Sequence, residues 1–210
     1  MHSTKALLDL PFELREAIYE YLVVKPANTI TMLENHNCFQ NEVSAAQPAI
    51  TRVNRQIRAE ALPLFYKSNV FLAELSEKLD LDIAKRWLIA IGNSNVVHLR
   101  RLVLCGWSQV IYQGRPSRLW IRCLFDLKDG TLTIDGNHVV VNGKKYISKD
   151  MSMMQQAFQF MIEYLDGGAW NELALRYFLE GFHEHCMKCS TKFCMKCSQA
   201  KKKGVETPHG

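Results

Sequence analysis

Several features of exported and membrane proteins are missing from this sequence of 210 residues. It has no run of about eighteen apolar residues, which excludes an obvious membrane-spanning helix. The first residues, Met1–Lys5, lead into a polar-punctuated segment without a long apolar signal region, so we expect no export. The seven cysteines are an odd number, which argues against a closed disulfide framework. We therefore expect an intracellular protein, cytoplasmic or nuclear, with reduced thiols.

The short motifs of common catalytic and nucleotide-binding sites are also missing. The sequence contains no G-x-x-x-x-G-K-S/T, G-x-G-x-x-G, G-x-S-x-G or H-E-x-x-H. The net charge of +5 is modest and gathers towards the C-terminus, so it describes a tail more than a nucleic-acid-binding face. We expect no catalytic residues, no enzyme and no nucleic-acid partner.

Two short amphipathic helices stand out in the first seventy or so residues. The first follows Asp9, which we expect to cap it, with Pro11 in the first turn. Its apolar positions recur at helical spacing: Leu14, Ile18, Tyr21 and Leu22. The second helix has a similar stripe, and Pro63 is expected to end or kink it. Neither helix is stable alone at this length, so each must bury its stripe against the other or against a partner.

These two helices resemble the F-box-like N-terminal region of a large group of filamentous-fungal proteins. The resemblance rests on Leu10-Pro11-x-Glu13-Leu14-Arg15 and on Arg55-Gln56-Ile57-Arg58-Ala59-Glu60-Ala61, which stand for twin E-x-R motifs. The second motif departs from the pattern, because Gln56 stands where Glu is expected. Ordinary F-boxes have a short connection between the helices, whereas this chain inserts residues 25–48. Most members of the group have no known function.

The resemblance implies a protein-interaction surface, with a Skp-type adaptor of a ubiquitin ligase as the partner. The contact residues would be Leu10, Pro11, Leu14, Ile18 and Leu22, provided that they are exposed. The structural E-x-R residues would be Glu13, Arg15 and Arg58. We expect a buried arginine of the second helix, among Arg52, Arg55 and Arg58, to pair with Glu13 or Glu20 of the first and to fasten the helices together by bidentate contacts.

The remainder of the chain predicts an α+β fold. The inserted segment holds a strand near residues 29–33, and further strands are expected at 69–75 and 98–104, with a helix from Asp80 to Ile91 between them. Residues 119–148 alternate in strand fashion around Asp-Gly and Asn-Gly turns, which predicts an antiparallel meander. Helices follow from Met151 and from near Ala169.

The C-terminal region carries the sharpest chemical motif, two C-x-x-C pairs formed by Cys186, Cys189, Cys194 and Cys197. Four thiolates, with His183 or His185 as alternates, suit a tetrahedral zinc ion, although only four residues separate the pairs. The other interpretation is one long helix from Glu172 to Lys202 with several of these thiols on its apolar face. Both interpretations stay open at this point, and zinc is the only cofactor that the sequence suggests.

We therefore expect three parts: an F-box-like module over 1–75, an α+β body over 76–182, and a Cys/Lys-rich tail over 183–210. The favoured function is a non-enzymatic protein-interaction module that recruits substrates to a ubiquitin ligase. The alternative is a zinc-dependent protein or nucleic-acid binder that acts through the basic tail.

Overall fold

The computed structural model describes the backbone of residues 7–25, 29–32, 43–112, 115–135, 139–141, 144–146, 149–165 and 170–202, and the side chains of 7–25, 30–32, 45–107, 120–133, 155–165 and 170–187. The N-terminal elements are η1 (Leu7–Asp9), α1 (Phe12–Val23), β1 (Thr29–Thr31), β2 (Val43–Ser44), η2 (Ala49–Arg52), α2 (Arg55–Ser68) and β3 (Val70–Glu74). The elements that follow are α3 (Lys78–Ile91), α4 (Asn93–Val96), β4 (Arg101–Tyr112), β5 (Arg115–Asp126), β6 (Thr131–Asp135), β7 (Val139–Val141), β8 (Lys144–Tyr146), α5 (Lys149–Tyr164) and α6 (Glu172–Lys202). The fold is mixed α+β, as predicted.

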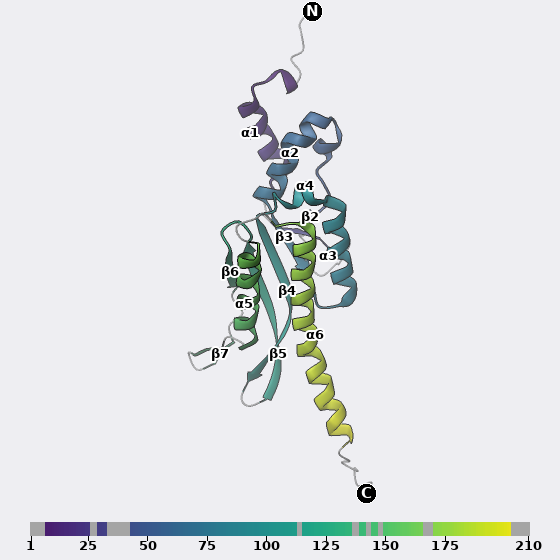
Figure 1. Ribbon diagram of the computed structural model, residues 1–210, viewed down its shortest axis with the longest axis vertical. Coiled ribbons are helices and arrows are strands. Elements are labelled where there is room, and N and C mark those ends of the chain that lie inside the picture. Colours follow the sequence, from purple (N-terminus) through teal and green to yellow (C-terminus); the bar gives the residue numbers. More distant parts are fainter. Residues whose placement is uncertain are drawn as a thin grey trace, which may run out of the picture.

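A mixed sheet forms the centre of the molecule, with strand order β2-β1-β3-β4-β5-β6. The strands from β2 to β4 are parallel, and β4, β5 and β6 are antiparallel. In Figure 1, α6 lies in front of the sheet, with α3 on one side and α5 on the other. Parallel neighbours need crossover connections, and α2 and α3 occupy these positions in the chain.

One hydrophobic core joins the N-terminal and C-terminal parts of the chain. It extends from Tyr19 of α1 to Cys186 of α6 and includes alternate residues of the central strands, such as Leu102 and Leu104 of β4. The intervening Val103 and Cys105 belong to a smaller cluster on the opposite face of the sheet. The core continues across the boundaries expected at residues 75 and 183, because β3 pairs with β4 and α6 runs through residue 183 without a break.

The predicted meander forms two antiparallel pairs, β5–β6 and β7–β8, but the described residues do not join them into one sheet. Strands β5 and β6 pair as expected around a turn where Gly130 has a φ of 64°. Within the described residues, β7 and β8 pair only with each other and form a separate sheet of two strands. Turn residues predict hairpins, but they do not predict which hairpin joins a larger sheet. The turns at Gly136 and Gly143 lie outside the described residues.

Helix ends were predicted with mixed success. Helix α3 covers the predicted 80–91 helix and ends at Gly92, whose φ is 73°. Asp9 does not cap α1, because it belongs to η1; Pro11 is the N-cap, and its carbonyl accepts the backbone N–H groups of Leu14 and Arg15. Pro63 does not end α2, which continues to Ser68. Its last turns are buried in the core, and that packing offsets the missing backbone hydrogen bond.

Helix α6 approaches the sheet closely at one point. A Cβ atom built on Gly106 of β4 would lie 2.5 Å from Sγ of Cys186, which is buried. Glycine at this position therefore lets the helix and the strand pack without a clash. Among the described residues, no helix combines the length and the apolar character needed to cross a membrane.

Replacing Gly106 by Ala is expected to destabilise the fold by about 1–3 kcal/mol, because the new methyl group meets the Cys186 thiol in a packed core. The free energy of unfolding in urea measures this effect. The double variant Gly106→Ala/Cys186→Ala should recover part of the loss, since the second change removes the clashing sulfur. Gly181→Ala on the open side of α6 is the control and should stabilise, because no atom lies within 4 Å of the added Cβ.

Candidate docking surface

An ion pair between Arg15 of α1 and Glu60 of α2 holds the two N-terminal helices together. The contact is bidentate: Nε donates to Oε2 at 2.9 Å, and Nη2 donates to Oε1 at 2.8 Å. The third guanidinium nitrogen, Nη1, donates to the Leu10 carbonyl, which precedes the helix. Both side chains are largely buried, with exposed fractions of 11% and 15%. The pair thus fixes the rotation of α1 on α2 and the path of the chain that enters α1.

Two further donors complete the environment of the Glu60 carboxylate. The Tyr19 hydroxyl donates to Oε2 at 2.9 Å, and the Gln56 side chain donates to Oε1 at 3.0 Å. The hydrogen bonds from Arg15, and then the one from Gln56, lower the pKa of Glu60 to about 2. Burial, followed by the hydrogen bond to Glu60, raises the pKa of Tyr19. The carboxylate is therefore ionised at neutral pH and fully hydrogen-bonded.

This geometry corrects the predicted E-x-R contacts. The ion pair has the opposite polarity to the prediction: the arginine, Arg15, comes from α1 and the carboxylate, Glu60, from α2. The three arginines expected to be candidates on the second helix are exposed: Arg52, Arg55 and Arg58. The side chains of Glu13 and Arg58 are exposed, and within the described residues neither forms an ion pair, so the second motif contributes Glu60 and not Arg58. Glu60 lies in the second motif, and the sequence predicted no ion-pair partner for its carboxylate. The one signal that could have identified Glu60 is its position beside Ala61, which is buried. A carboxylate that borders the contact between two helices needs a cationic partner on the other helix.

The ion pair turns the predicted apolar stripe of α1 towards solvent. Tyr19 and Val23, which are fully buried, face the core instead. The stripe residues keep large exposed fractions: Leu14 55%, Ile18 37%, Tyr21 87% and Leu22 44%. We call these four residues the α1 stripe. In Figure 1, α1 lies at the N-terminal end of the molecule, beyond the end of the sheet.

The structure also places the other two predicted contact residues. Pro11 is exposed at the helix N-cap, and Leu10 is half-buried, with its carbonyl bound by Arg15. Four of the five predicted contact residues therefore belong to the exposed surface. The fifth, Leu10, helps to position α1, because its carbonyl accepts a hydrogen bond from Arg15.

A row of carboxylates runs beside the α1 stripe. Glu13, Glu16 and Glu20 follow one another at spacings of three and four residues, which places them along one side of the helix. In the described part of the chain, none of the three forms an ion pair. An apolar strip with a charged rim has the general anatomy of a protein–protein interface.

The C-terminal cysteines lie on one continuous helix, as one of the two interpretations predicts. Helix α6 spans Glu172–Lys202, and Cys186 is buried in the core. At about 1.5 Å per residue, Cys186 and Cys197 lie roughly 16 Å apart along such a helix, too far to share one ion. Within the residues whose side chains are described, no group of three or more candidate ligands could hold a metal. The side chains of Cys189, Cys194 and Cys197 lie outside this set, so zinc binding by the tail stays an untested prediction.

The two histidines proposed as alternate ligands occupy different environments. His183 is buried, and its Nδ1 atom lies 3.0 Å from the Leu75 carbonyl. This is the geometry of a histidine whose Nδ1–H group donates within the core. His185 is half-buried. His183 therefore serves the packing of α6 against the end of β3.

Removing the ion pair is expected to lower the melting temperature. Arg15→Met and Glu60→Gln should each do so, because each leaves a largely buried charged or polar partner without its bidentate contact. The double variant should lose less than the sum of the two single losses, since both changes remove one interaction. Arg58→Met is the control and should leave the melting temperature unchanged, because Arg58 is exposed.

The low pKa of Glu60 also predicts a dependence of stability on pH. A carboxyl group with a pKa near 4.3 in the unfolded chain and about 2 in the folded protein stabilises the fold above about pH 5. That contribution is lost progressively as the pH falls towards 2. Urea unfolding of the wild type should therefore weaken more steeply over this range than unfolding of Glu60→Gln. Parallel pH profiles for the two proteins would contradict the assignment.

Comparison with known proteins identifies no relative of this chain. No protein-family model, no curated protein and no solved structure matches it. The resemblance of the N-terminal helices to an F-box-like region therefore stays a prediction.

Proposed function

We propose that this chain is a non-enzymatic protein-interaction module that docks a partner through the α1 stripe. The F-box-like pattern of the N-terminal helices favours a Skp-type adaptor as that partner, with the chain acting as a substrate-recruiting subunit of a ubiquitin ligase. The observation that carries the proposal is the exposure of Leu14, Ile18 and Leu22 on one face of α1.

The spacing of these residues supports recognition by another helix or by a groove. Leu14, Ile18 and Leu22 recur at every fourth position, as in helices that insert apolar side chains into a partner. Burying a fully exposed aliphatic side chain contributes about 1.5–3 kcal/mol. Each of these residues is already about half covered, so the gain is about 1 kcal/mol per residue before the costs of association.

Rigid attachment of α1 supports the same proposal. The bidentate contact between Arg15 and Glu60 and the buried Tyr19 hold the helix in place before any partner arrives. A surface that is already ordered loses less conformational entropy on binding. The α1 stripe is therefore preorganised for docking.

A binding assay with purified Skp-type adaptor tests the proposal directly. The Leu14→Asp/Ile18→Asp variant places two carboxylates in the α1 stripe and should abolish binding, with the circular dichroism spectrum unchanged. Leu79→Asp/Ile89→Asp is the matched control, because these two residues are exposed to a similar extent on α3. This control should bind as the wild type does.

The results for the three proteins distinguish two claims: that the partner is a Skp-type adaptor, and that the α1 stripe is the docking surface. Binding by the wild type and the α3 control, but not by the α1 variant, supports the adaptor proposal. Failure of the folded wild type to bind any Skp-type adaptor contradicts the ubiquitin-ligase part. Equal binding by all three proteins contradicts docking through the α1 stripe.

A further inference from the structure

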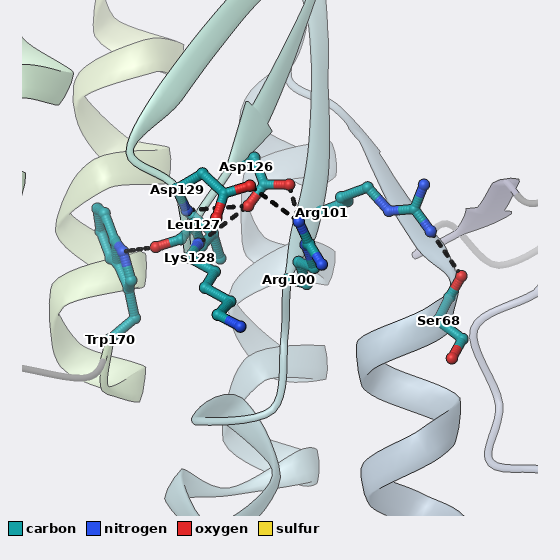
Figure 2. Close-up of polar contacts among 8 residues, drawn as sticks. All are labelled: Ser68, Arg100, Arg101, Asp126, Leu127, Lys128, Asp129 and Trp170. Atoms are coloured by element: carbon teal, nitrogen blue, oxygen red, sulfur yellow. Dashed lines mark hydrogen bonds and ion pairs between the residues drawn. The ribbon is translucent and has the colours of Figure 1, made fainter.

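A basic cavity lies at the C-terminal end of α2, away from the ion pair between Arg15 and Glu60. It has a volume of about 390 Å³ and forms where α2 ends, β4 begins and β5 ends. Its lining residues are Lys67, Ser68, Arg100, Arg101 and Asp126. Figure 2 shows Arg100 directed towards the turn after β5, and Arg101 directed the other way, towards Ser68. The two neighbouring arginines therefore have different surroundings.

The charge of Arg100 is balanced by carboxylates. Its Nε donates to Asp126 at 3.0 Å, and its Nη2 donates to Asp129 at 2.8 Å. The second oxygen of Asp126 accepts the backbone N–H groups of Lys128 and Asp129, each at 3.1 Å. These contacts brace the turn between β5 and β6 (Figure 2). Arg100 and Asp126 thus satisfy each other and leave little net charge in the cavity.

Arg101 and Lys67 are not balanced in this way. The one hydrogen bond of the Arg101 side chain runs from Nη2 to the Ser68 carbonyl at 2.8 Å. Its Nε atom is buried and has no hydrogen-bond partner. Lys67 is exposed, and within the described residues neither cation pairs with a carboxylate. Among the described residues, these two cations therefore have no carboxylate of their own, and the second carboxylate at Arg100, that of Asp129, offsets only one of the two charges.

A purely structural role explains only part of this arrangement. Arg101 satisfies a carbonyl in the last turn of α2, where cations are favoured by the helix dipole. That role occupies Nη2 alone. The Nε atom is buried and closed to a ligand, so the donors that remain for one are those of the two Nη nitrogens that the Ser68 carbonyl does not use.

We propose that this cavity binds a phosphate group, either as inorganic phosphate or as a small phosphate monoester. The Arg101 guanidinium, already oriented by the Ser68 carbonyl, presents nitrogen donors that suit two oxygens of one oxyanion. Lys67 adds a second positive charge at the same cavity. The volume exceeds that of a single phosphate ion several-fold, which leaves room for the organic part of an ester.

Isothermal titration calorimetry of the full chain tests the site. Inorganic phosphate and glycerol 2-phosphate are the two ligands, each titrated at an ionic strength held constant with chloride. Lys67→Met and Arg101→Lys should each weaken binding by about tenfold, since each removes one charge-assisted contact or the guanidinium fork. Arg86→Met on α3 removes an exposed cation elsewhere and should bind as the wild type does.

Each outcome decides the proposal. Wild-type binding that is lost in the two cavity variants supports it, and the tighter ligand shows whether the ion or the ester is preferred. No binding of either ligand by the wild type overturns it. Equal weakening of binding by Arg86→Met also overturns it, because the anion would then be attracted by the positive charge of the protein as a whole and not by this cavity. Lys67 is exposed at the surface, so Lys67→Met keeps the test decisive even if Arg101→Lys fails to fold.

Discussion

The bidentate contact between Arg15 and Glu60 is the constraint on which the N-terminal part of the structure depends. It joins residues 45 positions apart and selects which side of α1 meets α2. Once Arg15 faces Glu60, Tyr19 and Val23 must enter the core, because they lie on the same side of the helix. The α1 stripe is then left outside. The ion pair and the full burial of Tyr19 and Val23 together define the side of α1 that packs inward, although the most regular apolar row lies on the other side.

The close approach of α6 to the sheet fixes the packing of the C-terminal part, as the ion pair fixes the packing of α1. Glycine at position 106 admits the Cys186 side chain, and the same helix places His183 under the end of β3. The last long helix is therefore built into the core that begins at Tyr19. Because one core spans both ends, the α1 stripe and the basic cavity at the end of α2 are parts of one folded unit.

The sequence predicted local structure well, but it predicted poorly which distant residues contact one another. Helix α3, the span of α6 and the Gly130 turn follow from periodicity, capping and glycine geometry, all of which depend on neighbouring residues. The Arg15–Glu60 pair, the separation of β7 and β8 from the main sheet, and the cavity at Lys67 and Arg101 depend on residues distant in the chain. The α1 stripe residues recur at helical spacing, but that spacing did not decide whether they are exposed. The same spacing suits a core and a docking surface.

The most direct test of this account is the free energy of unfolding of Leu14→Asp/Ile18→Asp, measured in urea beside Val23→Asp. If Arg15 and Glu60 hold the α1 stripe in solvent, the double variant should lose only about 1–2 kcal/mol, the worth of the half-covered part of the two side chains. Val23→Asp should lose several-fold more, because it buries a carboxylate in the core. A large loss of stability in the double variant would show that the α1 stripe belongs to the core, and it would contradict the account.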